Sequence, residues 1–351
     1  MRGLIPGLLR LLAALVVIIT TAPGATAQEW LLDKDWFLPL SADPKPPAIT
    51  FAFPMITDEF EFSQESGKRM TWEVNVGKEI PIFTGQNFTT ATPIVGRWGV
   101  GLWVAVSFHV LEELGKDPSN PIINTDYRFS LATIKARRVQ KASGRGPNHA
   151  DYLDIKADLW HHESTHLGDE FVLGAIQNPS FERINVSYEF WDVAGSYEWR
   201  RLKRVGDDPF YRHVVRGGLV GVWPYAGGYY SDHTLDPAGR TIARSKRNLE
   251  PYLQYEFWAP HGAKTFAPFA SVDARYKTVY DYHKASDDVN EDKQWSTNLM
   301  AGFRTPLEAP LSVKEIYARW YYGVNPHGQL RNQRDFTTFG IGINFNIGQR
   351  R

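Results

Sequence analysis

The chain has 351 residues, with 39 Lys and Arg against 39 Asp and Glu, and it contains no cysteine. The balanced charge argues against a nucleic-acid partner, and the lack of cysteine excludes a fold held by disulfides. Phe, Trp and Tyr make up 14% of the residues, and abundant aromatics with few long apolar runs are typical of outer-membrane β-barrels.

The first 27 residues have the organisation of a signal peptide. Arg2 and Arg10 flank the start of the apolar run Leu11–Ile19, and Ala25–Ala27 has the small-x-small form of a cleavage site. The apolar run is shorter than the ~20 residues that a membrane-spanning helix needs. We therefore expect cleavage before Gln28 and export of the mature chain, with a retained anchor as the alternative.

Residues 28–69 are predicted to form an irregular N-terminal segment in the periplasm. The stretch from Pro39 to Pro47 contains four prolines, which neither a helix interior nor a central strand accommodates. Within this segment, Ala48–Phe53 is a candidate first short strand.

From Met70 onward, apolar and polar residues alternate in long rows. The clearest apolar row comprises Trp98, Val100, Leu102, Val104, Val106, Phe108 and Val110. A tilted membrane strand needs roughly 9–11 residues, and the pattern recurs about every 20–25 residues, which suits long strands joined by loops. The polar rows carry charges that a soluble core would not bury unpaired. Residues 70–351 are therefore predicted to form a transmembrane antiparallel β-barrel of about 12 strands, with a soluble all-β domain as the alternative.

The stretch Asp151–Phe171 concentrates the reactive side chains. As a helix it would present the zinc-protease pattern HExxH, but strict alternation from Leu153 to Trp160 favours a strand. On a regular strand, His162, Ser164 and His166 share the face of Asp158, which points towards the lumen. The strand count places this end of the strand nearer the periplasm.

Three chemistries remain open for this stretch. In a strand His162 and His166 lie ~13 Å apart, too far to share a zinc ion, so no metal site is predicted. A bulge near Gly168 could still gather His166, Asp169 and Glu170 into an ion site. The pair His162 and Ser164 could act as a catalytic dyad, although an enzyme acting on outer-leaflet lipid needs both residues to face the membrane. A β-bulge would turn them outward.

The third reading is a polar cluster in the lumen. It comprises His166, Asp169, Glu170 and Asp158 beside His162 and Ser164, hydrogen-bonded to Arg183, Arg128 or Arg97 of neighbouring strands. The other histidines, including His109 and His327, are isolated in the sequence and are assigned to polar faces or loops.

Several segments resemble a bacterial outer-membrane family of unknown function (domain of unknown function 1207). The matching segments are Trp36–Pro47, Asn124–Arg128, His161–Phe171, Asn325–Leu330 and Phe339–Phe345. The family often carries a residue other than Glu at position 163, so the resemblance does not support the protease motif. It implies an outer-membrane barrel and no established activity. The final strand, with Thr338, Gly340, Ile343 and Phe345, is similar to the C-terminal assembly signal of such barrels.

The sequence thus predicts an integral outer-membrane barrel of a Gram-negative bacterium with a structural or small-solute role. The alternative is a lipid acyl hydrolase of the phospholipase or lipid A deacylase type, whose His-x-Ser dyads the pair His162 and Ser164 resembles. Expected partners are outer-membrane lipids and, during biogenesis, the barrel assembly machinery. No nucleic acid and no cofactor is expected.

Overall fold

The computed structural model describes residues 37, 39–57, 68–84, 98–114, 122–140, 149–167, 184–202, 209–231, 242–243, 249–260, 265–279, 292–306, 313–331 and 333–345. The predicted signal peptide, residues 1–27, lies outside them. Among the described residues no helix is both long and apolar enough to cross a membrane.

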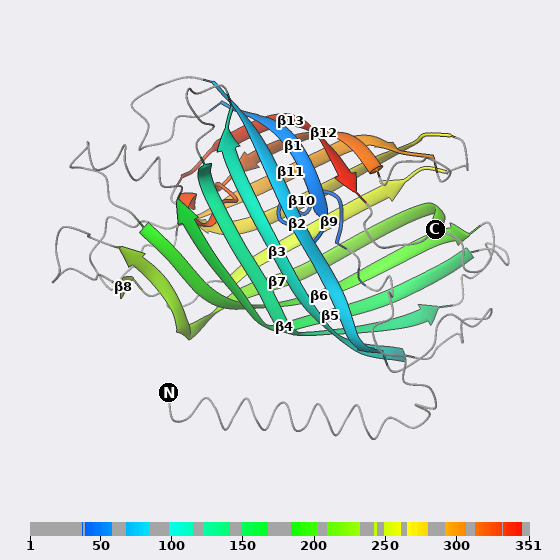
Figure 1. Cartoon of the computed structure of the whole chain (residues 1–351). Helices are drawn as coiled ribbons and strands as arrows, with labels where there is room; N and C mark the ends of the chain where they lie inside the picture. The colour runs from blue at the N-terminus through cyan, green and yellow to red at the C-terminus, as the bar shows by residue number, and fades with distance from the viewer. Residues whose placement is uncertain are drawn as a thin grey trace.

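Thirteen strands form one antiparallel sheet, and all of them except β8 make a closed ring of 12 (Figure 1). The ring consists of β1 (Ile49–Ile56), β2 (Arg69–Thr84), β3 (Trp98–Glu113), β4 (Ile122–Gln140), β5 (His149–Leu167), β6 (Ile184–Leu202), β7 (Pro209–Ser231), β9 (Leu249–Trp258), β10 (Ala267–Val279), β11 (Asp292–Arg304), β12 (Val313–Gly323) and β13 (Phe336–Phe345). Strand β8 (Ile242–Ala243) pairs with β7. Neighbours in the ring follow chain order, and β13 closes it by pairing with β1. The prediction of about 12 strands is confirmed.

The two faces of the wall differ as the alternation predicts. Apolar side chains are exposed on the outside, including Leu131 at 57%, Leu253 at 58% and Ile341 at 61%. Inside, charged residues such as Lys135, Arg212 and Glu256 are at most 2% exposed. Arg212 pairs with Glu198 and Glu256, both at 2.9 Å. The lumen is therefore a network of paired charges inside an apolar wall, which is the arrangement of a transmembrane barrel.

The N-terminal segment differs from its predicted place. Residues 39–48 lie inside the barrel, and Ile49–Ile56 form β1 of its wall, so the barrel begins at Ile49 and not at Met70. The reason is that β1 provides the backbone hydrogen-bonding partner for β13 on one side and for β2 on the other, and so closes the ring. The segment binds opposite walls, since the Asn298 amide of β11 donates to the Ala42 carbonyl at 2.6 Å and Lys45 Nζ lies 2.7 Å from Asp126 of β4.

One glycine makes room for this segment. The Gly77 amide of β2 donates to the Ala48 carbonyl at 3.0 Å, and a Cβ on Gly77 would lie 2.9 Å from the Cα of Pro47. Any larger residue would push the segment away from the wall.

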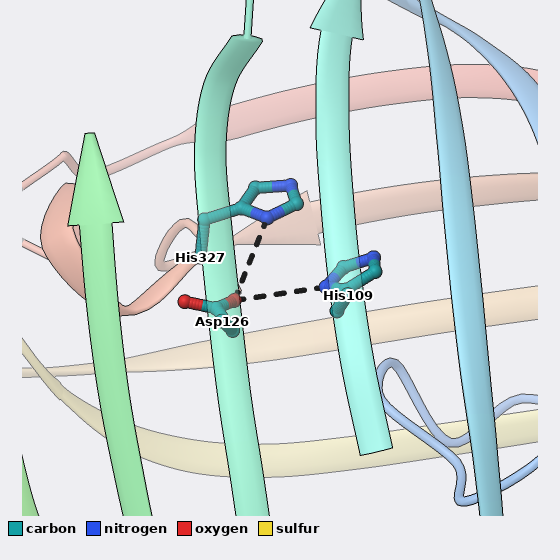
Figure 2. Close-up of side chains that lie close together, drawn as sticks. All are labelled: His109, Asp126 and His327. Atoms are coloured by element: carbon teal, nitrogen blue, oxygen red, sulfur yellow. Dashed lines mark ion pairs between the residues drawn. The ribbon is translucent and has the colours of Figure 1, made fainter. Parts of the chain in front are cut away.

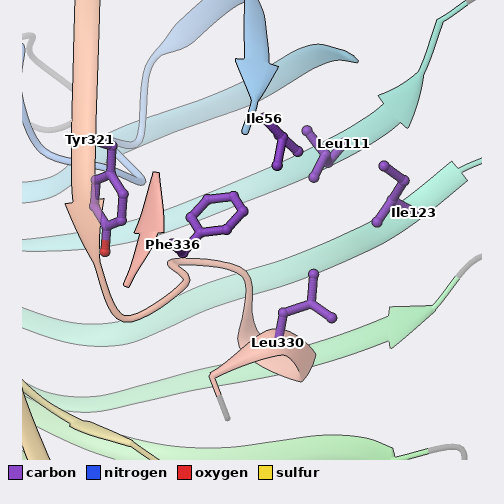
Figure 3. Close-up of a cluster of buried hydrophobic side chains, with 6 residues drawn as sticks. All are labelled: Ile56, Leu111, Ile123, Tyr321, Leu330 and Phe336. Carbon is purple, nitrogen blue, oxygen red and sulfur yellow. The ribbon is translucent and has the colours of Figure 1, made fainter. Parts of the chain in front are cut away.

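A buried apolar cluster lies in the lumen near one end of the barrel (Figure 3). It joins the wall to the connection between β12 and β13, which contains the short 3₁₀ helix η1 (Gly328–Leu330). Its members are Ile56, Leu111, Ile123, Tyr321, Leu330 and Phe336. This connection therefore folds back into the barrel and is held there by burial of Leu330.

Candidate functional site

Strand β5 contains a bulge just before its histidines. Asp158 pairs with Asp192 and His161 pairs with Phe190, so Leu159 and Trp160 together stand opposite the single residue Trp191. An extra residue in one strand shifts the side-chain alternation by one position. The face of β5 that points outward before the bulge therefore points inward after it.

As a result, His162, Ser164 and His166 lie on the outer face. Across the β4–β5 pair, Ser164 stands opposite Tyr127, and His162 stands opposite Phe129. Tyr127 and Phe129 are exposed, at 41% and 36%. The prediction that His162 and Ser164 face the lumen is thus wrong, because the bulge breaks the alternation on which it depended.

Four polar side chains form a row on this face. Ser164 Oγ lies 3.2 Å from His166 Nε2, and His162 Nδ1 lies 3.3 Å from Glu189 Oε1 on the neighbouring strand β6. The His162 side chain is 21% exposed and Glu189 is 19% exposed. We call His162, Ser164, His166 and Glu189 the outer-face cluster. A carboxylate on a lipid-facing surface is costly, and its pairing with an imidazole lowers that cost.

Aromatic rings surround the outer-face cluster. The ring of His162 lies 4.9 Å from that of Phe129 and 6.3 Å from that of Trp160, and the ring of His166 lies 5.7 Å from that of Tyr127. Such residues are typical of the boundary between lipid and headgroups. The outer-face cluster therefore has the aromatic surroundings that such a boundary favours.

The register of the strands fixes which rim carries the cluster. We call the rim that holds the β12–β13 connection the loop rim, and the opposite rim, where Phe345 lies, the terminal rim. Phe336 begins β13 at the loop rim. The residue pairs at this same rim can be followed from β13 through β1, β2, β3 and β4 to β5, where Leu167 pairs with Asn124. The outer-face cluster therefore lies near the loop rim. Strand β1 adds one crossing to a count that begins at Met70, and each added crossing reverses the strand direction.

The remaining predicted site residues that the structure describes lie apart from the outer-face cluster. Asp158 is buried in the lumen, where it accepts from Ser130 Oγ at 2.6 Å and contacts His161 Nδ1 at 3.1 Å. Thus Asp158 and His166 lie on opposite faces and do not form one polar cluster. Glu163, which also faces the lumen, contacts Arg128 at 3.1 Å. Because β5 is a strand, the helical zinc-protease pattern is absent. Asp169, Glu170, Arg183 and Arg97 lie outside the described residues.

A second group of buried polar residues was not predicted. Figure 2 shows His109 of β3 and His327 of the β12–β13 connection side by side, each joined by a dashed line to Asp126 of β4. The His109 and His327 Nδ1 atoms lie 3.6 and 3.9 Å from the same Asp126 oxygen, and their rings stack at 5.0 Å. Burial and the adjacent His109 lower the pKa of His327 to about 3, so its imidazole is neutral.

This group meets the spacing of a metal site, since one ligand atom of each residue lies within 4.8 Å of the others. Its charges are already compensated, however. Lys45 Nζ lies 2.7 Å from Asp126 Oδ2, and Glu73, which contacts His109 at 2.9 Å, also pairs with Arg319. A divalent ion would add uncompensated charge to a buried region. We interpret the group as an ionic junction between the N-terminal segment, the wall and the β12–β13 connection.

The model of the family described as "Protein of unknown function (DUF1207)" matches residues 13–207. No curated protein matches the chain. Among solved structures it is similar to the outer membrane phospholipase A of Escherichia coli, with 12% identity, a TM-score of 0.43, and coverage of 90% of this chain and 94% of that one.

It is also similar to the transport unit of the autotransporter AIDA-I of Escherichia coli, with 13% identity, a TM-score of 0.39, and coverage of 89% and 94% of the two chains. The β domain of the Bordetella autotransporter BrkA gives 11% identity, a TM-score of 0.36, and coverage of 86% and 99%. The family match spans more than half of the chain, as the quoted segments predicted, and the protein therefore belongs to the DUF1207 family of unknown function.

Proposed function

We propose that this barrel hydrolyses acyl esters of membrane lipids, with Ser164 as the nucleophile. The observation that carries the proposal is the outward direction of Ser164, between two histidines and near a carboxylate, at the edge of the apolar belt. A lipid ester can approach a side chain on this face without entering the barrel.

In the proposed mechanism His162 is the general base and Glu189 orients it. Glu189 lies against Nδ1 of His162, which leaves Nε2 to accept a proton, as in other serine hydrolases with a carboxylate behind the histidine. His162 and Ser164 are two residues apart on one strand face, ~7 Å between their α-carbons. A rotation about the Ser164 Cα–Cβ bond carries Oγ from His166 towards His162.

The reaction would proceed in two balanced steps. Ser164 Oγ attacks the acyl carbonyl carbon while His162 accepts its proton, the ester C–O bond breaks, and the leaving alcohol takes that proton. Water then attacks the acyl-serine and gives a proton to His162. The fatty acid leaves and Ser164 Oγ recovers its proton.

The proposed setting is the outer membrane of a Gram-negative bacterium, with the loop rim outside the cell. Some connections at the loop rim, such as residues 168–183 and 232–248, are longer than several connections at the terminal rim, such as residues 203–208 and 259–266. Longer loops are extracellular in bacterial barrels. On this orientation the outer-face cluster meets outer-leaflet lipids, and the end of β13 is presented to the assembly machinery in the periplasm.

The test is hydrolysis by the purified protein in detergent. Wild-type protein is incubated with phospholipid or with lipid A, with and without calcium, and released fatty acid is measured by mass spectrometry. We expect release by the wild type and none by Ser164→Ala. No release from either lipid under any of these conditions would overturn the proposal.

A structural role is the second candidate, and the filled lumen favours it. Ion pairs and the N-terminal segment brace opposite walls, as the contacts of Lys45 with Asp126 and of Ala42 with Asn298 illustrate. If this is the whole function, Ser164→Ala leaves every measured property of the barrel unchanged.

A further inference from the structure

We infer that the lumen contains a binding site for a small oxyanion such as phosphate, built around Lys277. This inference does not rest on the proposed hydrolysis, because the lumen and the outer face are separated by the barrel wall. It rests on a cavity, on the charges that line it, and on one buried ammonium group.

The cavity has a volume of about 70 Å³ and lies between the N-terminal segment and the β12–β13 connection, with Pro44 and Pro326 in its lining. A single buried water needs about 10–15 Å³. The cavity is therefore large enough for several waters or for one small oxyanion with few of them.

Its lining is rich in positive charge. Five cationic side chains line it against three carboxylates, those of Asp43, Glu163 and Glu250. The cations are Lys45, Arg128, Arg275, Lys277 and Arg331. A cavity with low-dielectric walls and an excess of one sign of charge attracts ions of the opposite sign.

Four of the five cations already contact carboxylates. Lys45 and Arg128 contact Glu163, at 2.7 and 3.1 Å. Arg331 pairs with Glu250, and Arg275 contacts Asp273 at 2.8 Å.

Lys277 differs from them. It is only 7% exposed, and within the described part of the chain it makes no hydrogen bond and no ion pair. Burying an unpaired ammonium is expensive. An oxyanion in the cavity would supply the missing partner and would offer further oxygens to the neighbouring guanidinium groups.

The position of Glu250 sharpens the inference. Its carboxylate accepts from the Thr278 amide at 3.0 Å and holds Arg331, so it competes with any anion for the same cations. Neutralising Glu250 should strengthen anion binding, whereas a mutation that only loosened the barrel would weaken it.

The experiment is equilibrium dialysis of the purified full chain in detergent with labelled inorganic phosphate at low ionic strength. We expect saturable binding that Lys277→Met weakens tenfold or more, the scale of one hydrogen bond to a charged group. Glu250→Gln should tighten it. The matched control is Lys135→Met, which removes another buried lumen lysine, one paired with Glu79 outside this cavity, and it should leave the affinity unchanged.

A parallel series with glycerol 3-phosphate distinguishes the source of the anion. Tighter binding of inorganic phosphate would indicate a free solute, and tighter binding of glycerol 3-phosphate a lipid headgroup. Heat-dependent gel mobility confirms that each variant is folded. The inference is overturned if wild-type protein shows no saturable binding, if Lys277→Met binds like the wild type, or if Glu250→Gln binds more weakly.

Discussion

The carboxylate of Glu189 lies 3.3 Å from Nδ1 of His162 across the β5–β6 pair, on the outer face of the barrel. A regular β5 would have turned His162 to the other side, away from Glu189. The contact therefore depends on the bulge at Leu159 and Trp160, and the proposed chemistry depends on the contact.

The bulge predicts which positions of β5 meet lipid. The chain has no cysteine, so single cysteines can carry spin labels without background. Labels at Ile155→Cys and Ser164→Cys should be accessible to dissolved oxygen in the membrane, and labels at Lys156→Cys and Thr165→Cys should not. Equal accessibility at positions 164 and 165, or the reverse order, would rule out the outward direction of Ser164.

The proposed roles of the histidines give unequal effects on hydrolysis. His162→Ala should lower the rate of fatty acid release about 10²- to 10⁴-fold, the range for loss of a general base. His166→Ala should have a smaller effect, because the proposed general base is His162, whose Nδ1 lies against Glu189. The matched control is His213→Gln, since His213 also lies among aromatic rings, 4.8 Å from Trp199, and its ring nitrogens contact the hydroxyls of Tyr255 and Tyr211.

Glu189→Gln tests whether the carboxylate acts through His162. It should lower the maximal rate while the Michaelis constant changes little, because Glu189 orients the base and does not bind the acyl chain. If the double variant Ser164→Ala with Glu189→Gln loses no more activity than Ser164→Ala alone, the two residues act together. Unchanged rates in Glu189→Gln would assign the base to His166 instead.

Lys45 is expected to hold the N-terminal segment in the lumen. Its ammonium is 2.7 Å from both Asp126 and Glu163, and all three side chains are buried. Lys45→Met removes the ammonium group that both buried carboxylates contact. This loss should lower the free energy of unfolding by about 3–5 kcal/mol. The measurement is the urea midpoint of the gel-mobility shift, with Lys293→Met at an exposed contact as control. A midpoint equal to that of the wild type would contradict this role.

The filled lumen also predicts electrical behaviour. Wild-type protein in planar bilayers should show no open-channel conductance, because residues 39–48 and the β12–β13 connection occupy the lumen. Deletion of residues 39–47 should produce conductance steps. Large, stable steps in the wild type would show that these segments do not close the barrel.

Much of the architecture follows from the sequence, because a period of two is a direct consequence of strand geometry. The rows from Trp98 to Val110 and from Phe339 to Phe345 became β3 and β13 as predicted. The bulge was harder to locate, since the alternation continues smoothly from Asp158 to His162. The neighbouring strand β4 gives one indication in the sequence. Ser130 and Thr133 are both polar but three positions apart, and both are buried, so the alternation along β4 shifts by one residue between them.

The lumen contacts could not be predicted from local pattern. His109 and His327 are 218 positions apart in the sequence (327 less 109), and they meet only because β3 and the β12–β13 connection share one end of the barrel. The position of residues 39–48 likewise depends on the closed ring. A Pro-rich stretch has no periodicity that indicates whether it lies inside or outside.

Covalent modification of Ser164 separates a lipid hydrolase from a purely structural barrel. Purified wild-type protein in detergent is treated with a long-chain alkyl fluorophosphonate, and the adduct is located by mass spectrometry, with a known serine hydrolase in the same micelles as positive control. We expect one adduct per chain, at Ser164, absent in Ser164→Ala and strongly reduced in His162→Ala. An unmodified wild-type chain beside a modified control, or an adduct at another residue, would contradict it.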